Sequence, residues 1–402
     1  MQLEKVTVVS RHSVRAPLDR YLKDLDKLVP PGKEWTRWSV EGSHLTLKGA
    51  ALETMFGEYF RLWLAKENFQ LNPSEVYFGA SSKQRTIATA RCFAAGMLPL
   101  MTVPIEYKTT KDGHVGYSDP DFIPLLNARS AARFDTTAFV TEAYRELAGK
   151  TTPSYDFLEK VLQYKRSPLA QERNYPHFHS GFNIKLDFVD SQGNYLEPLM
   201  TGDLTLANKA TDALILMYYE GKGPKAKALG KKISFDDLKK IADIKDHYDD
   251  ILFTAPIIAA NVSHCLLVRI YPEVQDAQHK FSFLCTHDTS ILASLTTLRV
   301  KDYSLPETIE GKVPIGSKFL IERWVDSKGE RYIRTRMVYQ SSRQIREMET
   351  LDLTNPPMSV DLSFEGLEKA PNGMYRYQDF VRHFQTALDA YNATALGKNP
   401  FE

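Results

Sequence analysis

The sequence predicts an α/β fold, with a mostly parallel central sheet flanked by helices and an inserted α-helical cap. Two observations lead to this prediction. Three segments share one order: a short β-branched or aromatic run, a turn with charged residues, and a helical pattern. Between the second and third segments the chain shows helical patterns and few strand signals. Because the carboxyl ends of parallel strands meet at one edge of a sheet, we expect the three turns to lie together.

The three segments are spread over most of the chain. The first strand is predicted over residues 6–10 and runs into Arg11 and His12. The second strand is predicted over 76–80, before a turn at 81–85 and a helix over 86–97. The third is predicted over 281–285, before the turn Thr286-His287-Asp288 and a helix over 290–298. Each strand therefore ends directly before residues that can carry chemistry.

The other predicted elements complete two domains. Apolar residues at three- and four-residue spacing predict one long helix over 45–69, and alternation around a Gly-containing turn predicts a hairpin over 318–339. Residues 376–395 are predicted to form a closing helix. We expect a discontinuous catalytic domain, residues 1–118 and 250–402, and a helical cap over 119–249. The helices expected in this cap cover residues 136–147, 155–166, 204–220 and 235–244.

Composition argues against several classes of protein. The 402 residues carry 51 basic and 50 acidic side chains, a net charge of +1, which does not favour binding to nucleic acid through bulk charge. No apolar run reaches the ~18 residues that would suggest a membrane span. The N-terminal residues show no export signal, so none is expected in the sequence as given. Because basic and acidic side chains balance, any binding of an anion must depend on a local cluster of basic residues.

The first turn leads to the prediction of catalysis. It reads Arg11-His12-Ser13-Val14-Arg15-Ala16-Pro17, so two guanidinium groups flank one imidazole. Planar guanidinium groups are well shaped to bind pairs of phosphate oxygens. A neutral imidazole nitrogen can attack phosphorus and form a phosphohistidine that water later hydrolyses, which requires no metal. We therefore expect His12 to be the nucleophile, and Arg11 and Arg15 to bind the phosphate.

The other two turns supply the remaining candidates. Arg85 is expected to bind the phosphate with the two first-turn arginines, and His287 could add a further donor. The leaving alkoxide needs a proton, and Asp288 is the candidate general acid, a role worth roughly 100- to 10,000-fold in rate. Cations around His12 favour its neutral form, while Asp288 must hold a proton. The rate is therefore expected to be highest at acid pH.

No metal or other cofactor is expected. Cys92, Cys265 and Cys285 lack metal-ligand spacing and are too few for a disulfide scaffold, although one pair could bridge in an oxidising compartment. His177 and His179 stand two residues apart, but no third ligand at suitable spacing accompanies them. The predicted chemistry is therefore carried by protein side chains alone.

These motifs resemble those of the histidine acid phosphatases, the branch of the histidine phosphatase superfamily that includes phytases. The likeness covers most of the chain and rests on the Arg-His-x-x-Arg-x-Pro run at residues 11–17 and on residues 287–289, with further similarity at 84–97 and 314–324. The resemblance implies a phosphoglycerate-mutase-like α/β domain with an α-helical cap. It also implies a phosphohistidine, a proton donor at Asp288, and a location in the periplasm or outside the cell.

Two departures from the family pattern bear on the substrate. Position 13 is Ser where the family usually has Gly, which narrows the space beside the nucleophile. Leu18 and Asp19 follow the motif where phytases of the bacterial branch typically have Thr-Lys, and a carboxylate there should disfavour a highly anionic inositol polyphosphate. Leu18 and the stretches 202–208 and 218–221 resemble glucose-1-phosphatase, a relative that acts on sugar phosphates. The residues predicted to border the leaving group are Ser13, Leu18 and Asp212.

Several functions remain open on the sequence. The leading prediction is a metal-independent acid phosphomonoesterase that takes a small phosphorylated sugar, with glucose 1-phosphate as the first compound to test. A phytase that acts on inositol polyphosphates is the second, and a mutase that moves the phosphoryl group between hydroxyls is a further alternative. From another class, the chain could be a catalytically silent phosphate-binding protein, although a pure binder needs neither His12 nor Asp288. The oligomeric state does not follow from these residues.

Overall fold

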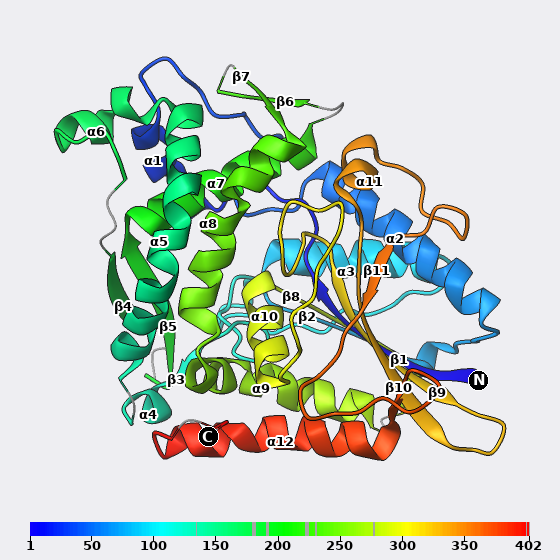
Figure 1. The fold of residues 1–402 in the computed structure, drawn as a ribbon. Helices are drawn as coiled ribbons and strands as arrows, with labels where there is room; N and C mark the ends of the chain where they lie inside the picture. Colours follow the sequence, from blue (N-terminus) through cyan, green and yellow to red (C-terminus); the bar gives the residue numbers. More distant parts are fainter. Residues whose placement is uncertain are drawn as a thin grey trace.

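A central sheet organises the structure, a computed structural model that describes residues 1–401 except 134, 179–181, 190–192, 222–224, 230, 276–277 and 399. The sheet has seven strands in the order β11-β10-β9-β1-β8-β2, with β12 paired to β10. Helices cover the sheet, and a second group of helices stands beside it (Figure 1). The predicted α/β class with flanking helices is confirmed.

The sheet is mixed, which corrects the prediction of a mostly parallel one. Parallel pairing joins β1 to β8 and β8 to β2, whereas β9, β10, β11 and β12 run antiparallel to their partners. The predicted hairpin exists as β9 and β10, but β9 pairs with β1 and so extends the main sheet. A turn signal identifies a hairpin and does not identify the strand beside it. The strands are β1 (Gln2–Arg11), β2 (Val76–Ala80), β8 (Phe281–Thr286), β9 (Lys318–Val325), β10 (Arg331–Tyr339), β11 (Met358–Asp361) and β12 (Tyr375–Arg376).

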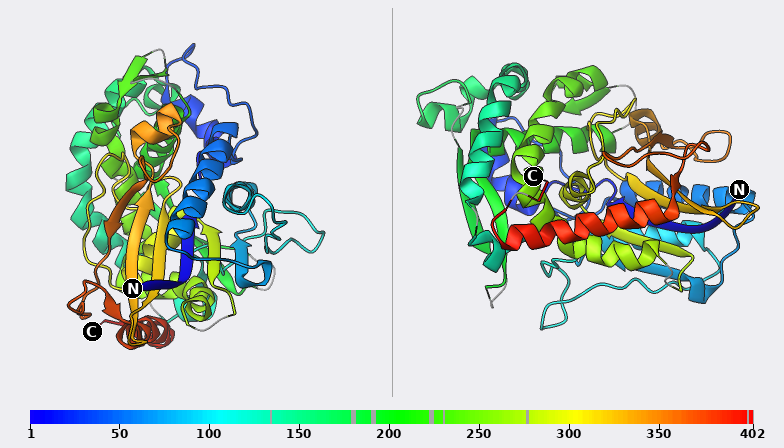
Figure 2. Two further views of the ribbon diagram at one scale, coloured as in Figure 1. Left: turned by 90° about the vertical axis from the view of Figure 1, so that its right-hand side faces the viewer. Right: turned by 60° about the horizontal axis from the view of Figure 1, so that its bottom comes forward.

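Alternate residues of the central strands face two helical layers. Val8 and Phe283 belong to one buried cluster, which includes side chains of α2 and α3, and Val9 and Leu284 belong to another, which includes side chains of α9, α10 and α12. Figure 2 shows α12 alongside α9. Both faces of the central strands are therefore covered, and apolar side chains are buried on each side. The bounds are α2 (Leu47–Lys66), α3 (Gln84–Met97), α9 (Pro256–Val274), α10 (Asp288–Thr297) and α12 (Tyr377–Ala395).

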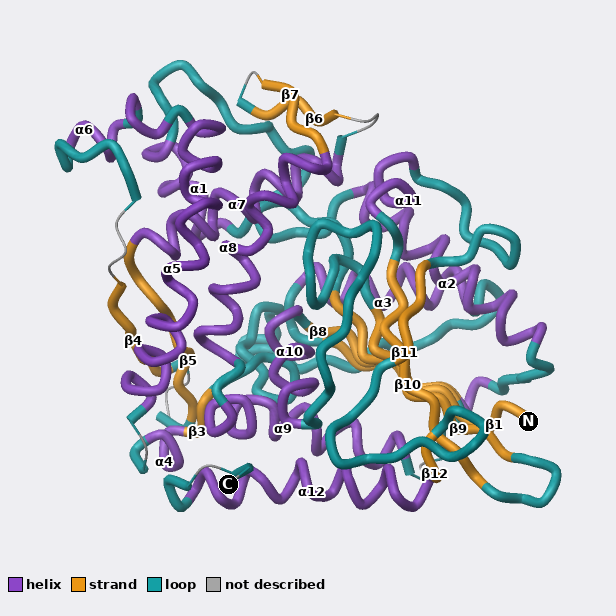
Figure 3. Tube along the Cα trace, in the orientation of Figure 1, coloured by secondary structure: helices purple, strands orange, loops and turns teal. Residues whose placement is uncertain are grey.

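The segment predicted as a helical cap contains strands as well as helices (Figure 3). Two of its expected helices are one long helix, α5, which continues through Pro153. The helix expected to end at residue 244 is α8, which continues to Phe253. Two small antiparallel sheets, β3-β5-β4 and β6-β7, were not expected. The bounds are α5 (Thr136–Leu162), α7 (Asp203–Glu220), α8 (Phe235–Phe253), β3 (Leu126–Asn127), β4 (Phe182–Phe188), β5 (Tyr195–Gly202), β6 (Lys225–Ala228) and β7 (Lys231–Ser234).

The division into a catalytic domain and a cap remains our proposal. The helices α5, α7 and α8 pack in one apolar cluster, but this cluster also includes Leu52 and Ile315 of the proposed catalytic domain, so the two parts share buried surface. The proposed boundary after residue 249 falls inside α8, so a boundary after Phe253 keeps that helix whole. Four short helices complete the chain: α1 (Asp19–Leu25), α4 (Ala128–Ala131), α6 (Pro168–Glu172) and α11 (Ser342–Glu347).

The carboxyl ends of the three parallel strands lie at one edge of the sheet. Arg11 of β1 is level with Thr286 of β8, and Ala80 of β2 is level with Cys285. The helix α3 begins at Gln84 and α10 begins at Asp288, directly after the turns. The three turns singled out in the sequence therefore meet.

The three cysteines form no disulfide in the described structure. Cys92, Cys265 and Cys285 are all described, and each is unpaired. Among the described residues, no single helix is long and apolar enough to cross a membrane. The pair α8 and α9 meets those criteria only when taken together, and the two helices are bent by 86°.

Candidate active site

His12 directly follows β1, and one of its ring nitrogens forms a hydrogen bond within the protein. Its Nδ1 lies 2.9 Å from the carbonyl oxygen of Ser13, so Nδ1 carries the proton and Nε2 keeps the free electron pair. Burial, followed by the charges of Arg85 and Arg15, lowers the pKa of His12 well below its ordinary value. The imidazole is therefore neutral even at acid pH. A neutral ring with a free Nε2 is the form that can attack phosphorus.

Arg85 lies beside His12 without a carboxylate partner. Among the described residues it forms no ion pair, and its Nη2 lies 3.4 Å from Nδ1 of His287. Burial, followed by the charge of Arg15, lowers the pKa of Arg85 to about 9. A buried cation that lacks a counter-charge is costly, so an anion in this place would stabilise the site.

His287 stands behind Arg85 at the end of β8. Its Nε2 lies 3.1 Å from the hydroxyl of Ser81, and burial together with the charge of Arg85 lowers its pKa well below the ordinary value. A neutral imidazole has one N–H, and here that proton can be shared with Ser81. The prediction that His287 donates to the phosphate stays a prediction.

Asp288 begins α10 and lies between two cations. Its Oδ2 is 2.9 Å from Nη2 of Arg11 and 2.8 Å from Nζ of Lys245, and its Oδ1 accepts the N–H of Thr289 at 3.1 Å. Burial alone would raise the pKa of Asp288, but Arg11 and Lys245 outweigh burial and hold it well below its ordinary value. The free site thus contains a carboxylate here. This corrects the expectation that Asp288 already holds a proton.

The three arginines of the predicted phosphate site share one feature. Arg11 pairs with Asp288 and Glu310, Arg15 pairs with Asp212 at 3.1 Å, and Arg85 is unpaired among the described residues. In each of the three, the Nε atom is buried and has no hydrogen-bond partner in the described structure. Of these three arginines, Arg15 and Arg85 line the cavity described below, so their guanidinium groups are the ones placed to bind an anion.

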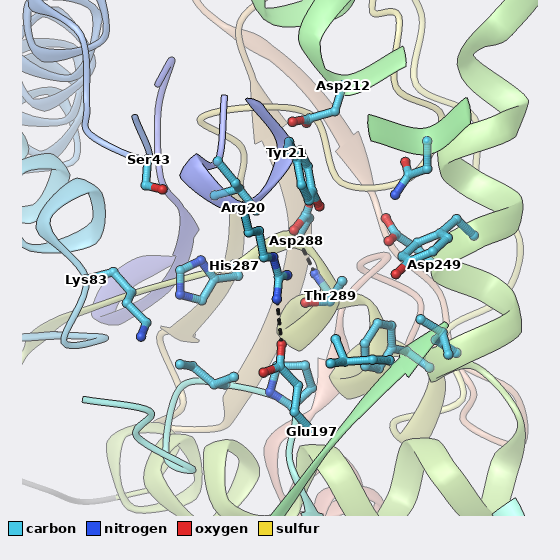
Figure 4. A pocket seen from close by; sticks show the side chains of 18 of the residues that line it. Arg20, Tyr21, Ser43, Lys83, Glu197, Asp212, Asp249, His287, Asp288 and Thr289 are labelled. Carbon is cyan, nitrogen blue, oxygen red and sulfur yellow. Dashed lines mark hydrogen bonds and ion pairs between the residues drawn. The ribbon is translucent and has the colours of Figure 1, made fainter. Parts of the chain in front are cut away.

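A cavity of about 420 Å³ opens over these residues, a size that suits a small ligand. Figure 4 shows Asp212, His287 and Asp288 around it, with Arg20 and Glu197 joined across the space by an ion pair of 3.1 Å. The predicted residues that line the cavity are His12, Arg15, Leu18, Arg85, Asp212, His287 and Asp288.

Two predicted residues do not line the cavity. Arg11 lies behind Asp288, where Val313 accepts from its Nη1 at 2.6 Å, so two of its donors are committed to the protein. Ser13 is 2% exposed, and its N–H donates to Thr89 at 3.2 Å. Ser13 is therefore buried beside the nucleophile instead of forming part of the wall for a leaving group. The motif gave its position next to His12 but not the direction of its side chain.

Several lining residues were missed by the sequence analysis. They come from α1, β5 and α8, which carry no recognisable motif. The helix α8 was expected to end one residue before Lys245. Lys245 and Asp249 stand four apart, a spacing that suits an ion pair, but α8 carries many other charged residues, so the spacing alone did not single out this pair. The missed lining residues with polar groups include Arg20, Tyr21, Glu197, Lys245, Tyr248 and Asp249.

No metal is implied by the described residues. No group of three or more His, Cys, Asp or Glu side chains among them could hold a metal ion. His177 pairs with Glu159 at 2.9 Å, while His179 lies outside the described residues. The charged and titratable side chains of the site include arginines, two histidines, two lysines and carboxylates.

The chain is similar to known phosphatases in both sequence and fold. A glucose-1-phosphatase of Salmonella typhimurium is 34% identical over 96% of this chain and 92% of its own length, and one of Providencia rettgeri is 32% identical over 97% and 93%. The phytase of Hafnia alvei has a similar fold, with a TM-score of 0.81, 25% identity, and coverage of 96% of this chain and 97% of the phytase.

The family model for the histidine phosphatase superfamily (branch 2) matches residues 2–338. This span contains the turns that meet at the carboxyl edge of the sheet, including His12, Arg85 and Asp288. The resemblance seen in the sequence is confirmed, and the chain belongs to the histidine phosphatase superfamily, branch 2.

Proposed function

We propose that this phosphatase hydrolyses a small sugar phosphate through a phosphohistidine at His12, without a metal. Membership of the family and the similarity to two glucose-1-phosphatases support a phosphomonoester hydrolase. The observation that carries the mechanism is the neutral His12 ring, with Nδ1 held by the Ser13 carbonyl and cationic arginines around it. A silent phosphate binder would not need this nucleophile.

The first step transfers the phosphoryl group to His12. Nε2 attacks phosphorus, the bond from phosphorus to the leaving oxygen breaks, and that oxygen takes a proton from Asp288. Arg15 and Arg85 neutralise the phosphate oxygens, and Arg11 holds Asp288 in place. Because Asp288 is a carboxylate in the free site, we infer that its proton enters with the substrate. A phosphomonoester is largely a monoanion below about pH 6, so the reaction is expected to favour acid pH.

The second step returns the enzyme to its starting state. Water attacks phosphorus, the phosphorus–nitrogen bond breaks with its electrons returning to His12, and the Asp288 carboxylate accepts a proton from the water. The low pKa of Asp288 suits the end of this cycle, because the proton can then leave with inorganic phosphate. Asp288 thus serves as acid in one step and base in the next.

The substrate is inferred from the cavity wall. Its polar groups, Arg20, Glu197 and Asp212, can hydrogen-bond to sugar hydroxyls, and Tyr21 and Tyr248 offer aromatic surface. Glucose 1-phosphate is the first candidate, supported by the names of the two relatives. Inositol polyphosphates are the second, supported by the fold shared with the phytase.

A single set of assays tests the proposal. The wild type, His12→Ala and His114→Ala, a control at an exposed histidine, are incubated at acid pH with p-nitrophenyl phosphate and a chelator. We expect turnover in the wild type and the control, and none in His12→Ala. Binding of phosphate without turnover would favour the silent binder. With glucose 1-phosphate as substrate, a product phosphorylated at another hydroxyl would favour a mutase. A panel with glucose 1-phosphate and inositol hexakisphosphate then ranks the substrates.

We also infer that the protein works in the periplasm or outside the cell. This inference rests on the family resemblance. Fractionation of cells that express the full gene, followed by assay of each fraction, tests it, and activity confined to the cytoplasm would contradict it.

A further inference from the structure

A lysine from helix α8 contacts the proposed proton donor. Lys245 Nζ lies 2.8 Å from Oδ2 of Asp288 and 2.9 Å from Oδ2 of Asp249, one helical turn further along α8. Lys245 and Asp249 are each 8% exposed, and both line the cavity. Figure 4 shows Asp249 on the α8 side of the cavity, with Asp288 facing it. The transfer of phosphate described above uses neither of these α8 side chains.

We propose that Lys245 and Asp249 position Asp288 and set the pH range over which it gives and takes its proton. This proposal rests on the proposed function, in which Asp288 is acid and then base. Lys245 acts through Asp288 and Asp249 acts through Lys245, so both are positioning residues.

The geometry restricts Asp288 from three directions. Two cations meet at Oδ2, Arg11 from β1 and Lys245 from α8, while the N–H of Thr289 binds Oδ1. Arg11 is itself fixed by Glu310, so it forms the rigid side of this arrangement. Lys245 is the contact that joins Asp288 to the helices beside the sheet. The orientation of the carboxyl group therefore depends on how α8 packs over the cavity.

The charges around Asp288 give the pair its influence on protonation. Burial raises the pKa of Asp249 to about 6, with Lys245 lowering it and Asp288 raising it. Below about pH 6, Asp249 becomes neutral and the Lys245 charge acts on Asp288 alone. Above it, the ionised Asp249 shares Lys245, and the pull on Asp288 weakens. The charged or titratable groups around Asp288 and the Lys245–Asp249 pair are Arg11, His12, Arg85, Asp212, Lys245, Asp246, Asp249, His287, Glu310 and Lys312.

Two substitutions are expected to act in opposite directions. Lys245→Met removes a cation from Asp288, so its pKa rises and the limbs of the pH–rate profile that report Asp288 move to higher pH, by about one unit or more. Asp249→Asn leaves Lys245 committed to Asp288 at every pH, so the alkaline limb moves to lower pH. A loss of structure alone would not produce shifts of opposite sign. Lys245→Arg should restore the wild-type profile in part.

The leaving group supplies a second distinction. With an alkyl phosphate, whose alkoxide needs a proton, kcat of Lys245→Met should fall about tenfold or more, with KM changed less than threefold. With p-nitrophenyl phosphate, whose phenolate leaves readily, the decrease should be smaller. Lys240→Met, at an exposed lysine of the same helix, is the matched control and should leave both profiles unchanged.

The protonation of Asp288 can also be measured without turnover. The amide of Thr289 donates to Oδ1 of Asp288, so its NMR shift against pH should report protonation of that carboxyl. We expect the midpoint to move upward in Lys245→Met. An active wild type whose Lys245→Met variant moves neither the limbs nor this midpoint would overturn the inference. A wild type that hydrolyses no phosphomonoester would instead overturn the proposed function, while the Thr289 titration would still test Lys245.

Discussion

Arg15 and Asp212 form a salt bridge of 3.1 Å between the turn after β1 and helix α7. Both side chains are nearly buried, and both line the cavity. A phosphate that binds Arg15 must therefore compete with the carboxylate already there, or share the guanidinium with it. Asp212 is thus placed to weaken the binding of free phosphate while remaining available to a sugar hydroxyl.

This salt bridge predicts that Asp212 weakens inhibition by inorganic phosphate but supports the turnover of a sugar phosphate. Asp212→Asn removes a negative charge beside the anion site, so inorganic phosphate should inhibit the variant more strongly, by about threefold or more. If Asp212 also binds the sugar, kcat/KM for glucose 1-phosphate should fall relative to that for p-nitrophenyl phosphate. Competitive inhibition and kcat/KM for the two substrates measure both effects. Unchanged phosphate inhibition would contradict the first.

Arg85 should stabilise the protein with phosphate bound and destabilise the protein without it. Its buried charge has no carboxylate partner among the described residues, and its pKa is lowered to about 9. In Arg85→Met the free protein should gain about 1 kcal/mol in free energy of unfolding, because an uncompensated charge is removed. Inorganic phosphate should bind about 100-fold more weakly. Thermal unfolding with and without phosphate measures both, with Arg85→Lys as the control that keeps the charge; a less stable free variant would contradict the argument.

Local patterns were sufficient to predict part of the site. His12, Arg85 and Asp288 each come soon after a short strand rich in β-branched or aromatic residues, and parallel strands bring their carboxyl ends together whatever the rest of the chain does. Lys245 could not be found in this way. Its contact with Asp288 joins residues 43 positions apart through the packing of α8, and no local pattern encodes that packing.

The same limit explains the errors in the fold. The hairpin of β9 and β10 is a local feature and was predicted, but the pairing of β9 with β1 joins the N-terminal strand to residues 318–325, far along the chain. Ser13 follows His12 in the motif, yet it does not line the cavity, and its backbone N–H is held by Thr89 of α3. Side-chain directions and strand neighbours follow from tertiary packing, which a single sequence does not display.

Asp246, which is not one of the proposed catalytic groups, should make the free energy of unfolding depend on pH. Burial raises the pKa of Asp246 to about 7, and Gly311 donates its N–H to this side chain at 3.3 Å. The folded state then holds a proton that the unfolded state releases, so the stability contributed by Asp246 falls as pH rises between about 4 and 7. Asp246→Asn removes this dependence.

The variant should therefore gain stability relative to the wild type on going from pH 5 to pH 8, by about 1–3 kcal/mol. Chemical denaturation at the two pH values measures the difference. Asp243→Asn, at an exposed position of α8, is the control and should show little change. An equal effect of Asp246→Asn at both pH values would show that its carboxyl is ionised throughout.

The rim residue Asp19 should limit the charge of accepted substrates. It is exposed, lines the cavity mouth as the first residue of α1, and accepts from the hydroxyl of Ser43 at 3.3 Å. Asp19→Lys reverses the charge at the entrance, so kcat/KM for inositol hexakisphosphate should rise about tenfold relative to that for glucose 1-phosphate. The gain should shrink as salt is added, because exposed charges are screened. Asp19→Asn should give a smaller increase, and a ratio that is unaffected by either variant would mean that the cavity interior, with Asp212 and Glu197, selects the substrate instead.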